Sequence, residues 1–80
     1  MKLPRDCTGD SLVRALTCLG YRVTRQTGSH VRVTTNIHGE HHVTVPNHNP
    51  IRVGTLQAIL KDLAEYHAMT IEDLVQTLHL

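Results

Sequence analysis

The spacing of hydrophobic residues changes twice along this chain of 80 residues. Leucines in the segment 12–19 recur every three or four residues, as they do on one face of a helix. Between residues 21 and 45, valines alternate with polar residues, as in strands that bury one face. Helical spacing returns over residues 56–64 and again over residues 71–78. The pattern therefore predicts one helix, then several strands, then two further helices.

Residues that favour the ends of helices and strands set the bounds of these elements. Thr8 is suited to cap the first helix, and Gly20 is suited to end it in a left-handed conformation. Pro46 ends the last strand, and Thr70 with Asp73 resembles a capping box before the last helix. We expect helices over about residues 9–19, 55–67 and 71–79, and strands over about residues 21–26, 30–35 and 41–45.

The alternation within the strands separates an apolar face of the sheet from a polar one. Val31, Val33, Val43 and Val45 share the apolar face, which a helix on either side of the strands in sequence can cover. The polar face is expected to carry Arg22, Thr24, Gln26, His30, Arg32, Thr34, His42 and Thr44. We therefore expect one α+β domain over residues 1–80, a double-stranded-RNA-binding-domain-like α-β-β-β-α sandwich with an additional C-terminal helix. That last helix either packs back on the domain or presents its apolar face to a partner.

The composition excludes several classes of function. With two tyrosines and no Phe or Trp, the chain lacks the row of aromatic residues on which single-strand-binding platforms stack bases. No apolar run is long enough to span a bilayer and no signal-peptide pattern is present, so we expect a cytoplasmic protein without a membrane partner. Cys7 and Cys18 lack the spacing of zinc ligands, and Cys18 is expected to be buried or half-buried in the first helix.

Charge is distributed unevenly along the chain, although the formal net charge is only +1. Basic side chains outnumber acidic ones up to Arg52, whereas acidic side chains dominate from Lys61 onward. Seven histidines add further positive charge when the pH falls toward 6. One part of the molecule is therefore suited to face a polyanion while the other is not.

The strongest candidate for chemistry is His30, which follows the turn formed by Gly28 and Ser29. Histidine is the side chain whose proton balance lies near neutral pH. Directly after a glycine turn, the ring is exposed while the sheet fixes its position. We interpret His30 as a general acid or base. The alternative is an exposed histidine at a strand end with no role in chemistry.

Several other residues are candidates for binding phosphate groups. Two arginines share the predicted face of His30, a third stands beside the turn, and the start of the second helix offers backbone N–H groups. The candidates are Arg22, Arg25, Ser29, Arg32, Gly54 and Thr55. The alternative for each is plainer: a solvated strand face, a residue that forms a turn, or an ordinary helix start.

The histidines between residues 38 and 48 suggest two further hypotheses. His38, His41, His42 and His48 invite a metal site, but neighbouring strand residues point to opposite faces, so His41 and His42 cannot easily share an ion. His38 and His41 flank a flexible turn and could share an ion, but no acidic or cysteine ligand except Glu40 completes the set, so we expect no metal site. His42 is also an alternative candidate for a second proton-transfer group, because it shares the polar face with His30.

Four short segments then carry a resemblance to a known family. They are Leu19-Gly20-Tyr21; Arg25-Gln26 leading into Gly28-Ser29-His30; Val43-Thr44-Val45-Pro46; and Val53-Gly54-Thr55-Leu56 continuing as Ile59-Leu60-Lys61-Asp62. In this order, on a helix–strand–strand–strand–helix frame, they resemble the HicA-type toxins, the small ribonuclease half of a toxin–antitoxin pair. The resemblance covers nearly the whole chain up to about residue 63.

The resemblance implies an endoribonuclease that cleaves messenger RNA without a metal or other cofactor. It places the family's essential histidine on His30 and implies a HicB-type antitoxin that covers the active surface. Two other classes of function remain open. One is a non-catalytic RNA-binding or protein-interaction module on the same fold, and the other is a histidine-rich metal-binding protein.

Overall fold

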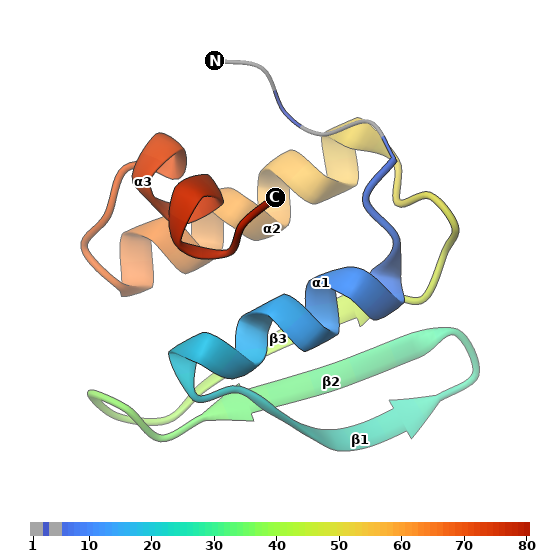
Figure 1. Cartoon of the computed structure of the whole chain (residues 1–80). Coiled ribbons are helices and arrows are strands. Elements are labelled where there is room, and N and C mark those ends of the chain that lie inside the picture. The colour runs from blue at the N-terminus through green and yellow to red at the C-terminus, as the bar shows by residue number, and fades with distance from the viewer. Residues whose placement is uncertain (1–2, 4–5) are drawn as a thin grey trace.

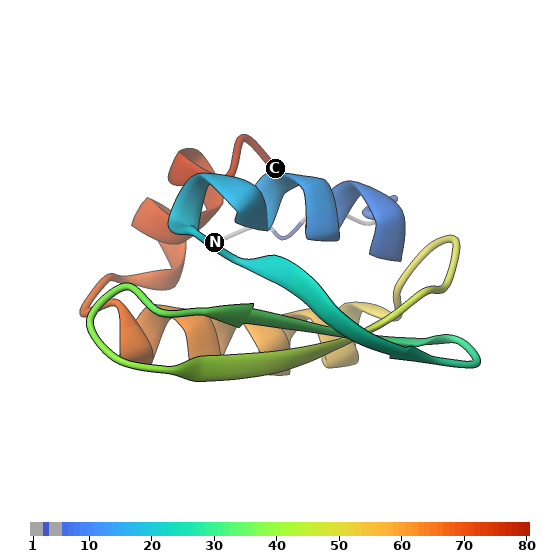
Figure 2. The same cartoon turned by 90° about the horizontal axis from the view of Figure 1, so that it is seen from below.

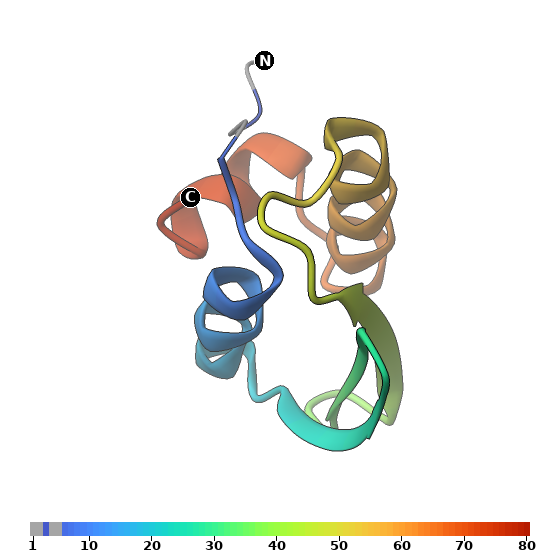
Figure 3. The same ribbon diagram turned by 90° about the vertical axis from the view of Figure 1, so that its right-hand side faces the viewer.

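A sheet of three antiparallel strands and three helices make up the computed structural model, which describes Leu3 and residues 6–80. The elements are α1 (Gly9–Leu16), the short 3-10 helix η1 (Thr17–Leu19), β1 (Arg22–Thr27), β2 (His30–Thr35), β3 (His41–Pro46), α2 (Val53–Tyr66) and α3 (Ile71–Thr77). The strands follow the order β1-β2-β3, and α1 and α2 lie on one side of the sheet (Figures 1 and 3). The predicted α-β-β-β-α fold with an additional C-terminal helix is therefore confirmed.

The first helix begins where its cap residue predicts. The Thr8 hydroxyl accepts a hydrogen bond from the Ser11 backbone N–H at 3.0 Å, and the Ser11 hydroxyl accepts one from the Thr8 N–H at 3.1 Å. This reciprocal pair satisfies two N–H groups that a helix start leaves without partners. α-Helical bonding ends at Leu16 rather than at residue 19, because the last turn tightens into η1.

Gly20 ends this segment in the left-handed conformation, with φ of 81°. A side chain there would also collide with Ile37, which follows β2. Glycine is therefore required at residue 20 for two reasons: the backbone conformation and the close approach of a neighbouring segment.

The hydrophobic core lies between the sheet and the helices. The valines predicted for the apolar face, at positions 31, 33, 43 and 45, are all buried there. α3 packs back on the domain rather than facing a partner, since Leu74 and Leu78 are buried in the same core. Cys18 lies in η1, where no residue is buried, and is itself exposed, so its predicted burial is wrong.

A β-bulge in β1 changes the side-chain pattern that simple alternation predicts. Val23 pairs with Val33, but Arg25 rather than Thr24 pairs with Arg32, so one extra residue is inserted. Gln26 then pairs with Val31, and its predicted place on the polar face is wrong. The bulge puts both Thr24 and Arg25 on the polar face instead.

Other bounds move by one or two residues for local reasons. β1 begins at Arg22 instead of 21 and β3 includes Pro46. α2 begins at Val53 instead of 55, because Arg52 takes the cap position and its carbonyl accepts from Leu56 N–H at 2.9 Å. α2 and α3 end slightly early because the residues that follow them turn left-handed, at Ala68 and His79.

Within the described part of the chain, no helix is long and apolar enough to cross a membrane.

Candidate functional site

His30 is the first residue of the central strand and its side chain is exposed. Its backbone is held on both sides, because it pairs with Thr27 of β1 and with Pro46 of β3. The turn before it contains Gly28, with φ of 57° and open space around it. Among the described residues, none makes a hydrogen bond or ion pair with the His30 ring. The imidazole therefore stands on a fixed backbone with both nitrogens available.

The segment after β3 ties the β1–β2 hairpin to the start of α1. The Asn47 N–H donates to the Ser29 carbonyl at 2.6 Å, and the Gly9 N–H donates to the His48 carbonyl at 2.9 Å. A side chain at Gly9 would collide with the backbone of Pro46 and Asn47. These contacts hold the turn of the hairpin, whose tip extends beyond the ends of the helices (Figure 2).

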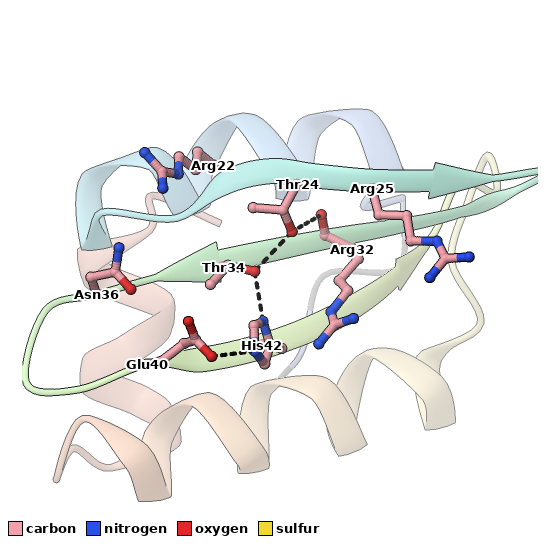
Figure 4. A pocket seen from close by; sticks show the side chains of 8 residues that line it. All are labelled: Arg22, Thr24, Arg25, Arg32, Thr34, Asn36, Glu40 and His42. Atoms are coloured by element: carbon pink, nitrogen blue, oxygen red, sulfur yellow. Dashed lines mark hydrogen bonds and ion pairs between the residues drawn. The ribbon is translucent and has the colours of Figure 1, made fainter.

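The polar face of the sheet, on the side away from the helices, carries an open groove of about 390 Å³. We call it the outer groove. Its lining residues come from all three strands and the β2–β3 turn: Arg22, Thr24, Arg25, Arg32, Thr34, Asn36, Glu40 and His42 (Figure 4). Polar and basic side chains, with the carboxylate of Glu40, thus line a surface that no helix of the described residues covers.

A chain of hydrogen bonds crosses the floor of the outer groove (Figure 4). The Thr24 hydroxyl donates to the Arg32 carbonyl at 3.4 Å and lies 2.8 Å from the Thr34 hydroxyl. His42 Nδ1 lies 2.7 Å from the Thr34 hydroxyl, and its Nε2 lies 3.0 Å from Glu40 Oε1. Thr24, Thr34 and His42 thus each have hydrogen-bond partners along this row. The floor is therefore ordered by its own hydrogen bonds.

Two arginines stand directly opposite each other in this groove. Arg25 and Arg32 are cross-strand partners because of the bulge in β1. Like charges in directly opposed positions destabilise a sheet. No described carboxylate lies within ion-pair distance of either arginine or of Arg22. An anion bound between the two guanidinium groups would remove this repulsion.

The structure brings some of the predicted site residues together and separates others. Arg22, Arg25 and Arg32 line one groove, and His30 precedes Arg32 by two residues on the same face of β2. Ser29 is exposed in the hairpin turn. The exposed Gly54 and Thr55 lie in the first turn of α2 and are not part of the groove lining.

A second polar cluster was not predicted from the sequence. The Tyr21 hydroxyl lies 2.6 Å from His41 Nδ1 and 2.9 Å from His67 Nε2. His41 stacks on Tyr66 with 4.1 Å between ring centres, and its Nε2 lies 3.4 Å from Asp62 Oδ1. We call these five residues the tyrosine cluster. They join the sheet to α2. The only sequence signal for this cluster is that Tyr21 and His41 occupy positions in the strand pattern that point toward the helices.

Burial controls the proton equilibria of the tyrosine cluster. Burial, with smaller contributions from the charges of Asp62 and Tyr66, raises the pKa of Tyr21 to about 12. Burial, followed by the nearby His41 and His38, lowers the pKa of His67. Both shifts favour the neutral side chains, so the cluster is built to stay uncharged at Tyr21 and His67.

The histidines considered for a metal site are dispersed over both sides of the sheet. His41 contacts Tyr21 on the helix side, whereas His42 lines the outer groove. Within Leu3 and residues 6–80, no group of three or more His, Cys, Asp or Glu side chains is arranged to hold a metal ion.

Comparison with known proteins identifies the family. The model of the family described as HicA toxin of bacterial toxin–antitoxin systems matches residues 9–64. Comparisons with curated proteins and with solved structures gave no match. The matched segment runs from the start of α1 almost to the end of α2, and it contains His30 and the outer groove. Because this match spans more than half of the chain, the protein belongs to the HicA family of toxins from bacterial toxin–antitoxin systems.

Proposed function

We propose that this HicA-family toxin is an endoribonuclease that cleaves messenger RNA without a metal or other cofactor, with His30 as general acid or base. The observation that supports the proposal is the state of His30: an exposed ring with both nitrogens available, on a backbone paired on both sides. A catalytic acid or base needs this combination of fixed position and uncommitted proton sites.

The chemistry requires two proton transfers and one site for negative charge. The 2′-oxygen of the RNA loses its proton and forms a bond to phosphorus, while the bond from phosphorus to the 5′-oxygen breaks and that oxygen gains a proton. His30 performs one of these transfers, and water or a second group performs the other. Arginines near His30 stabilise the extra charge on the phosphorane, and Arg32 is the nearest along the strand.

The other candidate residues have supporting places in this proposal. Arg22, Arg25 and Arg32 bind backbone phosphates, and the Ser29 hydroxyl contacts RNA at the turn. Gly54 and Thr55, which do not line the outer groove, contribute only if the RNA extends to the start of α2. The whole chain acts as one domain in the cytoplasm, where messenger RNA is found.

Family membership implies a cognate antitoxin partner. We propose that it is of the HicB type and suppresses cleavage by covering His30. The simplest expectation is that coexpressing the antitoxin restores the growth of cells that express the toxin.

The test of the catalytic role is controlled expression of the wild type and His30→Ala in the same cells, following growth and messenger-RNA integrity. We expect only the wild type to arrest growth and fragment RNA. The purified variant should lose cleavage about 10²- to 10⁴-fold, the usual contribution of a general acid or base. Cleavage by the wild type should persist in excess EDTA.

A matched control is His79→Asn, which changes an exposed histidine beyond α3. Asparagine tolerates the left-handed backbone found there, so this variant should fold and cleave normally. Equal cleavage by the wild type and His30→Ala at equal protein levels would contradict the assignment. RNA binding without cleavage by the wild type would favour the non-catalytic module.

A further inference from the structure

The two sides of the molecule carry opposite charge. The three strands contain Arg22, Arg25 and Arg32 and no carboxylate. The three helices contain five carboxylates and two basic residues: Asp10, Arg14, Lys61, Asp62, Glu65, Glu72 and Asp73. The helical side therefore repels a polyanion, while the outer face of the sheet attracts one.

From this asymmetry and the shape of the outer groove we infer that the protein binds RNA as a single strand laid along the outer face of the sheet, with Arg25 and Arg32 gripping the phosphate next to the one at His30. This inference rests on the proposed function and adds the substrate class and the path of the RNA.

The spacing along β2 supports this path. His30 and Arg32 are two residues apart on one face of the strand. Side chains so related are about 7 Å apart, which is comparable with one nucleotide of extended backbone. A phosphate held by the Arg25–Arg32 pair thus places the neighbouring phosphate beside the His30 ring.

The chemistry and the width of the sheet favour a single strand over a duplex. Attack by the 2′-oxygen must come in line with the leaving 5′-oxygen, and the backbone of an A-form duplex does not adopt that geometry. Three strands about 4.8 Å apart also make a face only about 10 Å across, which is narrower than a duplex. Binding is driven by phosphate contacts, since the outer groove contains no Phe, Tyr or Trp on which a base could stack.

Glu40 fixes which part of the nucleotide enters the rest of the groove. Its carboxylate repels phosphate, but it accepts hydrogen bonds, and Asn36 beside it offers both a donor and an acceptor. The base of the adjoining nucleotide therefore lies toward Glu40, His42 and Asn36, with the phosphates at Arg25 and Arg32. This arrangement makes the Glu40 end the part of the groove that selects a base.

The test measures equilibrium binding of wild-type protein and variants to a fluorescent single-stranded 2′-O-methyl RNA, which has no 2′-hydroxyl to attack. We expect Arg25→Gln and Arg32→Gln each to weaken binding about 5- to 10-fold. Each should also lower the dependence of log K on log salt by about 0.7, the value for one phosphate contact on a single strand. A duplex of the same sequence should bind more weakly than the single strand.

The matched control is Arg14→Gln, which removes an exposed arginine that α1 pairs with Asp10 on the helical side. It should leave RNA binding unchanged. Melting temperatures check folding, and those of the Arg25 and Arg32 variants should not fall, because each change removes one of two opposed like charges.

The outcomes separate this inference from the proposed function, because binding is measured on RNA that cannot be cleaved. Equal effects of Arg14→Gln and Arg32→Gln, or stronger binding of the duplex, would overturn the RNA path even if His30 proves catalytic. Normal RNA binding by the double variant Arg25→Gln/Arg32→Gln, together with loss of antitoxin binding, would assign this face to the protein partner instead. Normal binding with no cleavage by the wild type would contradict only the proposed function.

Discussion

The histidines of this small protein fall into two groups, which differ in whether their ring nitrogens make hydrogen bonds to other side chains. His30 stands exposed at the start of β2, without a side-chain partner among the described residues. In the tyrosine cluster, His41 and His67 are largely covered by protein, and each has a nitrogen at the hydroxyl of Tyr21. A histidine whose nitrogens are engaged with protein stabilises structure, while one with both nitrogens open can exchange protons with a substrate.

His42, in the outer groove, shares features with both groups of histidines. His42 is bound at both nitrogens by Thr34 and Glu40, yet its side chain is 37% exposed, whereas that of His41 is 14% exposed. Its hydrogen bonds leave no nitrogen open for the proton transfer that the sequence analysis considered. His42 is therefore poorly placed to act as a second proton-transfer group.

The largest effects are expected when His30 and His41 are each replaced by alanine. His30→Ala should lower cleavage about 10²- to 10⁴-fold and change the free energy of unfolding by less than about 0.5 kcal/mol. His41→Ala should instead lower the free energy of unfolding by about 1–3 kcal/mol, because Tyr21 loses a hydrogen-bond partner and Tyr66 loses its stacked neighbour. Urea unfolding and cleavage rates per folded molecule measure the two effects.

A folded His41→Ala protein that no longer cleaves RNA would contradict this division and move the catalytic group to the tyrosine cluster. A His30→Ala protein that is strongly destabilised would show that His30 has a structural role. Either result would contradict the distinction between histidines whose nitrogens are bound to protein and histidines whose nitrogens are available to a substrate.

Some features of this protein can be predicted from its sequence and others cannot, for a physical reason. The elements, the valine face and the cap at Thr8 follow from periodicity and local hydrogen bonds, so the sequence predicts them. His30 was also placed on the polar face, because a turn and a period of two residues position it. These features depend on neighbours within a few positions along the chain.

Features that depend on distant contacts were missed. No local signal predicts the bulge at Thr24, which moves Arg25 opposite Arg32 and so creates the basic pair. The tyrosine cluster joins Tyr21, His41 and His67, which come from three separate segments of the chain. Their meeting depends on how α2 packs against the sheet, and a single sequence does not show that packing.

The tyrosine cluster should also make stability fall in strong alkali. The pKa of Tyr21 is raised to about 12 by burial, and then by Asp62 and Tyr66, whereas a free phenol titrates near 10. The unfolded chain therefore loses this proton first. The stabilisation is complete below pH 10 and is lost as the pH rises through about 12, with a total of about 3 kcal/mol.

Urea unfolding between pH 8 and pH 11.5 measures this loss, with Tyr21→Phe and Tyr66→Phe as the variants. Tyr21→Phe should be less stable at pH 8, because His41 and His67 lose a partner, but its stability should decline less toward alkali. Tyr66→Phe should keep most of the alkaline decline. An equal decline in all three proteins would mean that Tyr21 titrates normally.

The smallest effect is expected on the acid side, at His67. Its pKa is lowered by burial and then by the positive charges of His41 and His38, so the unfolded chain binds a proton more readily than the folded one. Stability is therefore complete above about pH 6.5, the value for a free imidazole, and falls as the pH drops below it. His67 is only half-buried, so solvent screening keeps this change below about 1 kcal/mol.

His67→Gln isolates this effect, since glutamine still offers a donor and an acceptor to the Tyr21 hydroxyl. The variant should lose less stability than the wild type between pH 7.5 and pH 5.5 in urea unfolding, while His79→Asn should behave like the wild type. Cleavage by His67→Gln should match that of the wild type, because cleavage depends on the exposed His30. If His67→Gln changed the pH profile of cleavage and left that of stability untouched, the tyrosine cluster would be linked to catalysis, and the contrast between the two histidine groups would fail.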